Sequence, residues 1–397
     1  MEIVSIATHV PYVGIPHAGG QYYGRHVELL STRHRLTVVG PWTPANAAAL
    51  DQPAAGTARR VVAGAPPSGR AGRRRALFAR ALPFLATGPF RRALVADEDL
   101  VATLRRADAI ELQWFDAIVL APWLRRLLPG TPMTGVFHDV VTQGHRRRLM
   151  ACGAPLRHRA LALVRLLCCA PLERRVLRVL DTAVVLSDKD RALLAARGRS
   201  PRLVVAAPPL DDAEVPRSLE HRAPSGPEVL FVGALWRAEN EDAALWLLDE
   251  IWPAVRMRVP AARLTVAGAD PTQRIRQAAE AQPGVELTGR VASLAPFYRR
   301  STVAVVPVRL GAGVKLKTVV AMLWGVPVVA TTVGSEGIDG PDVFLSVTDE
   351  ATALADAVVA VLQNPHAAAD VAARAHAWAH DRYSSTAYRR VLEDVYG

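Results

Sequence analysis

The sequence predicts an α/β protein with two tandem domains, each a Rossmann-like, doubly wound parallel sheet. Three observations carry this prediction. The chain has 397 residues, more than one ordinary domain holds. Short apolar runs alternate with longer helical patterns in both halves, as in parallel strands joined by helices. A segment rich in proline and charge, residues 208–227, separates the two series and is expected to be a linker.

The first domain is expected to span residues 1–207. Its apolar runs are short and are followed by turn or polar residues, which is typical of buried parallel strands. The expected strands are Ile3–Ala7, Leu36–Val39, Ala109–Leu112, Met133–Phe137, Ala183–Leu186 and Leu203–Ala206. The expected helices are Gly20–Leu30, Leu100–Arg106 and a long one near Leu156–Leu180.

The second domain is expected to span residues 228–374, and the tail 375–397 to form a terminal helix. The expected strands are Val229–Val232, Arg263–Ala267, Val285–Leu287, Val303–Val306, Val326–Ala330 and Phe344–Val347. The expected helices are Glu241–Val255, Thr272–Ala281, Ala295–Arg300, Lys315–Leu323 and His376–Tyr396. Since ligands bind outside the carboxyl ends of parallel strands, we expect two such domains to face a cleft that holds one reactant on each side.

Composition predicts a cytoplasmic location for the chain. No apolar run reaches the roughly 18 residues needed to cross a bilayer. The first ten residues have no charged leader pattern and are expected to form a buried strand. Cys152, Cys168 and Cys169 have neither disulfide nor metal-ligand spacing, which fits a reducing compartment.

Charge is divided unevenly between the halves. Residues 1–210 carry 30 Lys and Arg against 14 Asp and Glu, a balance of +16, whereas residues 211–397 carry 18 against 23, a balance of −5. The segment Arg59–Arg92 holds nine arginines and no acid, and His145–Arg178 holds nine arginines and one acid. This pattern favours an anionic acceptor or an anionic membrane surface on the first domain, and a solvated arginine face is the alternative. No nucleic-acid motif is present, so no nucleic-acid partner is expected.

The stretch Val305–Ile338, VVPVRLGAGVKLKTVVAMLWGVPVVATTVGSEGI, has the properties of an anion site. A strand ends in a glycine loop that includes Gly313, and a helix then begins near Lys315. Glycines allow close approach of a ligand to the backbone, and a helix N-terminus offers free N–H groups to an anion. Two of the three lysines of the chain, Lys315 and Lys317, fall here, and Thr318 follows them. Phosphate binding is therefore expected, with a solvated basic helix start as the alternative.

This stretch resembles the donor-site signature of retaining glycosyltransferase family 4, which has the GT-B fold. The similar features are a Gly-x-Gly loop with a following lysine, Ala-Met-x-x-Gly, Pro-Val-Val-Ala-Thr and Gly-x-Glu-Gly. Phe231-Val232-Gly233, Phe137-His138-Asp139 and the glycines near the N-terminus also match family motifs in order. The tail with Trp378 resembles the terminal helix that crosses back to the first domain.

The resemblance implies roles for particular residues. In the second domain, the implied donor-phosphate contacts are Arg237, Lys315, Lys317, Gly313 and Thr318, and the other implied donor contacts are Gly233, Asn240, Arg290, Val291, Val320 and Glu336. In the first domain, His138 would contact the transferred sugar near its anomeric carbon, and Asp139 would orient the imidazole or cap a turn. Gly19 and Gly20 would form an acceptor-side loop before the first helix. Asn240 is equally suited to cap a helix, and Glu336 to fix its turn.

The sequence departs from the family pattern at two positions. The family usually carries two glutamates eight residues apart around this loop, and Ala312 and Val320 stand there. The second usually holds the nucleotide ribose. The basic residue usually found shortly after Arg237 is also absent, and Lys315 is a candidate to replace it.

The resulting hypothesis is transfer of a sugar from a nucleoside-diphosphate sugar to a hydroxyl acceptor with retention of configuration. The nucleotide sugar is a co-substrate, and neither a metal nor another cofactor is expected. The acceptor would be a glycan, a lipid-linked molecule or a natural product, with contact at the inner membrane face as a further possibility. The alternatives are a nucleotide-sugar epimerase and a binding subunit without catalysis.

Overall fold

The computed structural model describes residues 1–15, 18–66, 87–150, 156–198, 201–210, 215–216, 218–221 and 224–397. Parts of the predicted linker and of both basic segments, and Cys152, lie outside these residues. The chain forms two compact units. Unit 1 is Met1–Pro209 together with Ser385–Gly397, and unit 2 is Leu210–Ser384.

Unit 1 contains a seven-stranded sheet in the order β3-β2-β1-β4-β5-β6-β7, with every neighbouring pair parallel. The strands are β1 Glu2–Ala7, β2 Arg35–Pro41, β3 Arg59–Ala63, β4 Ala109–Gln113, β5 Met133–Phe137, β6 Thr182–Val185 and β7 Arg202–Val205. The central strands β4 and β5 are buried at every residue, as expected when helices cover both faces of a parallel sheet. The strand order reverses between β1 and β4, so this sheet has its topological switch point there.

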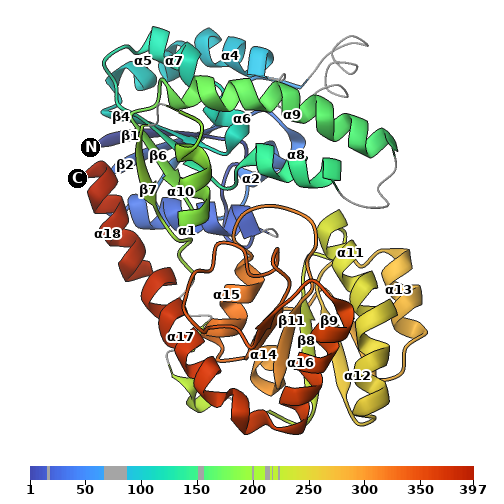
Figure 1. Ribbon diagram of the computed structural model, residues 1–397. Coiled ribbons are helices and arrows are strands. Elements are labelled where there is room, and N and C mark those ends of the chain that lie inside the picture. The colour runs from blue at the N-terminus through green and yellow to red at the C-terminus, as the bar shows by residue number, and fades with distance from the viewer. Residues whose placement is uncertain are drawn as a thin grey trace. The chain divides into compact units, whose positions relative to one another are not determined.

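Helices flank this sheet (Figure 1). They are α1 Ala18–Leu30, α2 Pro44–Ala49, α4 Thr87–Ala96, α5 Glu98–Arg106, α6 Phe115–Ile118, α7 Ala121–Leu127, α8 Val141–Met150, α9 Leu156–Leu177 and α10 Asp188–Ala195. Local sequence explains several of their ends. The side chain of Asp97 accepts a hydrogen bond from the Leu100 N–H and caps α5, and Ser187 caps α10 in the same way through the Asp190 N–H.

Unit 2 contains a six-stranded parallel sheet in the order β10-β9-β8-β11-β12-β13. The strands are β8 Glu228–Val232, β9 Arg263–Ala267, β10 Val285–Gly289, β11 Val303–Val306, β12 Val328–Ala330 and β13 Ser346–Val347. The order reverses between β8 and β11, which places the switch point of this sheet at the ends of those two strands.

The helical segments of unit 2 precede its first strand, connect its strands and follow its last strand. They are the 3-10 turn η2 Leu219–His221, α11 Ala238–Trp246, the π-helical segment η3 Leu247–Ile251, α12 Trp252–Arg258, α13 Gln273–Glu280, α14 Ala295–Arg300, α15 Leu316–Leu323, α16 Ala351–Gln363, the 3-10 turn η4 Pro365–Ala368 and α17 Ala369–Tyr383. The single predicted helix Glu241–Val255 was wrong in detail, because the π-helical turn divides it.

The tail forms two helices where the sequence predicted one. Helix α17 ends at Tyr383, Ser384 has an extended backbone, and α18 Ser385–Tyr396 begins directly after it. Helix α17 packs on α15 inside unit 2, whereas α18, red in Figure 1, packs on α1 and β7 of unit 1. The return of the chain to unit 1 therefore begins at Ser385.

Two parallel α/β sheets in tandem confirm the predicted fold class. Eleven of the twelve predicted strands overlap a strand of the same sheet by several residues, and Phe344–Val347 overlaps the two-residue β13. Strand β3 was not predicted. It is an edge strand that begins with two arginines and is only partly buried, so it lacks the apolar run that identifies a central strand.

Candidate functional site

The candidate donor site of unit 2 lies at the switch point of its sheet. The loop after β8 runs from Gly233 to Arg237, and the loop after β11 runs from Pro307 to Lys315. Strands β8 and β11 are neighbours, so the two loops emerge side by side at the carboxyl end of the sheet. Seven of the predicted donor residues lie in these loops or within three residues of them, namely Gly233, Arg237, Asn240, Gly313, Lys315, Lys317 and Thr318.

A glycine contact packs the β8 loop against the loop after β9. A Cβ atom on Gly268 would lie 1.7 Å from the carbonyl oxygen of Gly233, and the φ of Gly268 is 153°. Neither the space nor the backbone conformation allows a side chain there. The close contact with Gly268 therefore fixes the backbone of the β8 loop against the loop after β9.

Lys317 lies deepest of the cations at this site. Its ammonium donates a 2.6 Å hydrogen bond to Oδ1 of Asn240 and lies 4.8 Å from the centre of the Phe231 ring. A Cβ atom on Gly233 would lie 3.0 Å from Nζ of Lys317. Burial, together with the charge of Lys315, lowers the pKa of Lys317 to about 7. A lysine on α15 thus reaches the turn that follows β8.

Lys315 occupies the N-cap position of α15 and is bound by its own loop. Its Nζ donates to the Gly313 carbonyl at 2.7 Å and lies 3.6 Å from Oε2 of Glu336. Gly313 has a φ of 75°, which glycine adopts without strain. Both charged side chains of this ion pair are largely buried. The pair joins the glycine loop to the Gly-Ser-Glu-Gly turn, so Glu336 does help to fix that turn.

Arg237 and Asn240 begin α11 in different ways. Arg237 is the N-cap residue and forms a 2.6 Å ion pair with Glu239, while nearly half of its side chain stays exposed. Asn240 is buried and donates through Nδ2 to the Ala234 carbonyl at 2.9 Å. It therefore braces the β8 loop and accepts from Lys317, and the predicted capping alternative was wrong, since no side chain caps α11.

The remaining predicted donor residues lie farther out or play other parts. Thr318 is fully buried and donates to the Gly334 carbonyl at 2.8 Å. Val320 lies on the second turn of α15. Arg290 and Val291 follow the edge strand β10, where Arg290 is exposed and lies 3.5 Å from Asp270.

Arg309 is a cation of the β11 loop that the sequence analysis missed. Its guanidinium donates to both carboxylate oxygens of Asp242, at 3.1 and 2.8 Å, and lies 4.5 Å from the centre of the Trp246 ring. These contacts tie the β11 loop to α11. Its place two residues before Gly311 was a usable signal.

In unit 1, His138 directly follows β5 at the carboxyl end of the sheet. Its Nε2 lies 2.9 Å from Oε1 of Gln113, and its ring stacks on Trp114 with 4.2 Å between ring centres. The ring of Tyr22 meets it edge-on at 4.9 Å. Gln113 and Trp114 end β4 and were missed, although polar and aromatic residues at a predicted strand end are a signal for a site.

A buried polar network lies beneath this histidine. Glu111 on β4 is fully buried and accepts hydrogen bonds from Ser5, His26, Gln113 and Tyr396. The Tyr388 hydroxyl joins the network through Nδ1 of His26 at 2.8 Å and Oη of Tyr22 at 2.9 Å. Two tyrosines of α18 therefore reach the residues that support His138.

Asp139 lies beside another carboxyl group at the same edge. Burial, and then the charge of Asp139, raises the pKa of Asp116 to about 6. The expected loop positions of Gly19 and Gly20 were wrong. Both residues lie in the first turn of α1, because the helix begins at Ala18.

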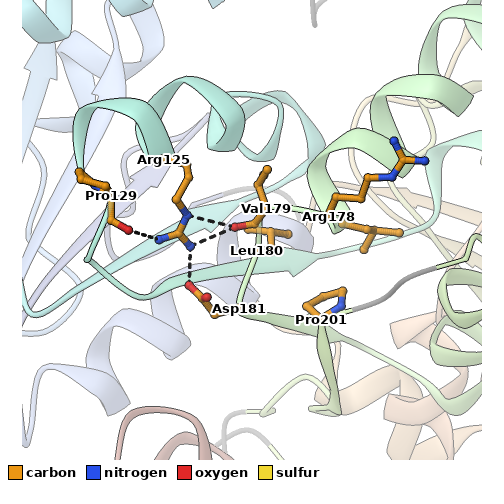
Figure 2. A pocket seen from close by; sticks show the side chains of 8 residues that line it. Arg125, Pro129, Arg178, Val179, Leu180, Asp181 and Pro201 are labelled. Carbon is orange, nitrogen blue, oxygen red and sulfur yellow. Dashed lines mark hydrogen bonds and ion pairs between the residues drawn. The ribbon is translucent and has the colours of Figure 1, made fainter.

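One pocket of unit 1, of about 530 Å³, lies at the opposite edge of the sheet (Figure 2). Arg125 donates there to the carbonyls of Pro129 and Val179 and to Asp181 at 2.5 Å. Asp181 immediately precedes β6, so this is the amino end of the strands. The Arg178 guanidinium points away from this group (Figure 2). Arg125 therefore ties the loop after α7 to the segment that precedes β6.

Two features are absent from the described residues. No group of three or more His, Cys, Asp and Glu side chains could hold a metal ion within that part of the chain. No helix found there is long and apolar enough to span a bilayer.

Comparison with known proteins finds a family match that falls in unit 2. Residues 226–364 match the family described as Glycosyl transferases group 1. An uncharacterized 44.6 kDa protein in the cps region of Klebsiella pneumoniae is 32% identical over 116 residues, 28% of this chain and 30% of that protein. The match thus spans less than a third of this relative's length.

Solved structures resemble the whole chain. Sucrose-phosphate synthase from Thermosynechococcus elongatus has a TM-score of 0.70 at 15% identity, covering 100% of this chain and 98% of that one. Anabaena HepE in complex with UDP-glucose has a TM-score of 0.66 at 15% identity, covering 100% and 99%. These neighbours establish the GT-B glycosyltransferase fold. The family match over unit 2 marks the chain as similar to group 1 glycosyltransferases.

Proposed function

We propose that the protein transfers a sugar from a nucleoside-diphosphate sugar to a hydroxyl acceptor, with retention of anomeric configuration. The observation that carries this proposal is the convergence of Arg237, Lys315 and Lys317 on two glycine loops at the switch point of unit 2. Support also comes from the family match over that unit and from the UDP-glucose named with the HepE structure.

The cations would act mainly on the leaving group. When the bond between sugar and diphosphate breaks, negative charge develops on the diphosphate, and fixed positive groups aimed at it stabilise the transition state. Lys317 and the N–H groups at the start of α15 supply such groups. His138 of unit 1 would contact the transferred sugar near its anomeric carbon, with Asp139 beside it. In this proposal no metal ion takes part.

A binding screen followed by a product assay tests the proposal. UDP, GDP and ADP are titrated calorimetrically, and the sugar conjugates of the nucleotide that binds are offered with hydroxyl acceptors. Proton NMR of the anomeric signal then compares product with donor. A product with the donor's configuration is expected. Inversion would overturn the retaining mechanism, and the absence of nucleotide binding would overturn the donor site.

A second candidate function is that of a subunit that binds the nucleotide sugar without catalysing transfer. Ala312 and Val320 favour it, since they replace the two glutamates usual in the family that the sequence resembles. This candidate predicts tight nucleotide binding without release of sugar in the presence of any acceptor. An epimerase would instead alter the configuration of the sugar in the free donor when no acceptor is present. The same NMR experiment therefore distinguishes glycosyl transfer, donor binding without turnover and epimerisation.

For the acceptor side, we propose contact of unit 1 with an anionic, lipid-linked acceptor at the inner face of the membrane. Helices α8 and α9 support this. Leu156, Leu163 and Leu167 of α9 expose 82%, 42% and 66% of their surface. Exposed arginines accompany them, namely Arg146, Arg148, Arg157, Arg159, Arg174 and Arg175. Leucines and arginines together on a helix surface suit the interface of an anionic bilayer.

Co-sedimentation with vesicles tests this contact. Each basic residue near an anionic leaflet contributes about 1 kcal/mol, screened by salt. The protein should therefore sediment with phosphatidylserine vesicles at low salt, less so at high salt, and not with neutral vesicles. The double variant Arg157→Glu, Arg159→Glu should lose binding, whereas the control Arg263→Glu, Arg274→Glu, which changes two exposed arginines of unit 2, should not. A wild-type protein that stays in the supernatant at low salt would contradict the proposal.

A further inference from the structure

The imidazole of His138 is held by the two residues that end β4. Nε2 of the ring faces the amide oxygen Oε1 of Gln113 at 2.9 Å. The indole of Trp114 stacks on the ring face, with an angle of 20° between the planes. Gln113 is fully buried. Its amide oxygen and NH₂ group therefore have no solvent partners and depend on hydrogen bonds within the protein. The direction of the amide, and so which of the two groups faces His138, then decides the hydrogen bond that the imidazole makes.

Glu111 decides that direction. The amide nitrogen of Gln113 donates to Oε1 of Glu111 at 2.9 Å. Burial alone raises the pKa of Glu111, but the charge of His26 and hydrogen bonds from His26, Gln113 and Tyr396 outweigh it and lower the pKa to about 2. An ionised carboxylate only accepts hydrogen bonds, so the NH₂ group of Gln113 must face Glu111 and its oxygen must face His138.

The amide oxygen of Gln113 in turn determines which ring nitrogen of His138 carries the proton. A carbonyl oxygen cannot donate, so the proton between Gln113 and His138 belongs to Nε2. In the neutral imidazole, Nδ1 is then the nitrogen that carries a lone pair. The contacts from Glu111 through Gln113 to His138 therefore fix one of the two tautomers of the imidazole.

The backbone of Trp114 indicates that the arrangement has a cost. Its φ of 65° and ψ of 154° lie in a region that residues other than glycine rarely adopt. Such strain persists where the surroundings impose it. Here the indole stacks on His138 and meets the rings of His9 and Tyr23 edge-on, at 5.3 and 5.2 Å.

We propose that Gln113 is a positioning residue that holds His138 in the tautomer protonated at Nε2, and that Glu111 orients the Gln113 amide for this role. In that tautomer Nδ1 is the ring nitrogen with the lone pair, which can accept a hydrogen bond or take up a proton. The consequence for turnover rests on the proposed glycosyl transfer. The tautomer itself does not.

The imidazole nitrogen shifts of His138 test the inference without any substrate. Long-range ¹H–¹⁵N spectra are recorded about two pH units above the usual histidine pKa of ~6.5, and the spectrum of His138→Asn assigns the signals. The wild-type protein should show Nε2 protonated. Gln113→Leu should introduce the Nδ1-protonated form, whereas Gln113→Glu, whose carboxylate still accepts from Nε2, should keep the wild-type tautomer.

Tyr396→Phe is the matched control. It removes a different donor from Glu111 and leaves the contact between Gln113 and His138 in place, so it should lower stability without changing the tautomer. A wild-type ring protonated at Nδ1, or a Gln113→Leu spectrum that keeps the wild-type tautomer, would overturn the inference.

Turnover gives a second readout. If His138 acts on the sugar, Gln113→Leu should lower kcat on the order of 10²-fold, as misplacement of a reacting group does, with UDP affinity unchanged and recovery in Gln113→Glu. Unchanged kcat with an altered tautomer would remove His138 from the reaction. The absence of turnover in the wild-type protein, with the expected tautomer present, would count against glycosyl transfer alone.

Discussion

The two strand-end sites of this protein are built in opposite ways. The site of unit 2 is assembled from short loops, and two of its cations form ion pairs with nearby carboxylates, Arg237 with Glu239 and Lys315 with Glu336. The site of unit 1 rests on a buried network that joins Ser5 to Tyr396 across the whole chain. A half-exposed ion pair such as that of Arg237 suits a ligand that brings its own charge. A rigid network suits a group that must keep one orientation.

This comparison predicts a division of labour, with nucleotide affinity in unit 2 and turnover in unit 1. Exposed ion pairs such as that of Arg237 contribute little to stability, so a diphosphate can displace the carboxylate at small cost. The network around Glu111 cannot be opened in that way, because each buried group would lose its partner.

The largest expected effect is on the rate of the His138→Ala variant. Loss of a positioned group at the site of charge development typically costs on the order of 10²- to 10³-fold in kcat. We expect kcat to fall by about that factor and UDP affinity to stay within error, measured by product formation and calorimetry. Full activity in this variant would make His138 a structural residue.

The next effect is on nucleotide binding by Lys317→Met. A lost charge-assisted contact costs about 1.5–3 kcal/mol, which is roughly tenfold to hundredfold in Kd. Lys315→Ala should weaken binding in the same direction. Lys189→Met, which removes the third lysine of the chain and its ion pair with Asp190, is the control and should leave calorimetric UDP affinity unchanged. Equal affinity in folded Lys317→Met protein would remove Lys317 from the site.

A smaller effect is expected on stability when the unit 1 network is opened. Tyr388→Phe removes the hydroxyl that lies between Tyr22 and His26. A buried polar group left without its partner costs about 1–3 kcal/mol, so the unfolding midpoint in urea should fall. UDP affinity should stay the same. A parallel loss of UDP affinity would show that the two sites are not separable.

The smallest effect is the pH dependence of UDP binding. Lys317 has a pKa of about 7 in the folded protein, with Lys315, Arg237 and Glu239 as its charged neighbours. It is a cation below this pH and loses its charge as pH rises, so affinity should fall by about tenfold between pH 6 and pH 8. UDP also ionises, and the pH dependence of affinity that this causes is measured with Lys317→Met and subtracted. Identical pH profiles in the two proteins would contradict the role of this lysine.

Sequence alone predicted the fold class, which the structure confirms, and the positions of the two glycine loops, because both depend on local patterns. Apolar runs identify buried strands, and the glycines and lysines from Gly311 to Lys317 are adjacent in the chain. The deep position of Lys317 was not foreseen, since it depends on how α15 approaches Gly233. Gln113 and Trp114 were missed for a related reason. Their importance comes from contacts with His138 and, for Trp114, with His9 and Tyr23, which are distant in sequence.

The break at Ser384 and the π-helical turn after Trp246 were also beyond a periodicity argument. Residues on both sides of each point have helical patterns, so the sequence favoured continuous helices. Packing decides otherwise. Helix α17 stays on α15, whereas α18 places Tyr388 and Tyr396 in the network of unit 1.

A crystal structure of the protein with UDP tests the central claim most directly, because the claim is that the switch point of unit 2 binds a nucleoside diphosphate. We predict that diphosphate oxygens lie within about 3 Å of Nζ of Lys317 and of the Arg237 guanidinium, with Arg237 released from Glu239. The N–H groups at the start of α15 should face the same oxygens. UDP bound elsewhere, or a diphosphate that contacts neither Lys317 nor Arg237, would contradict the account.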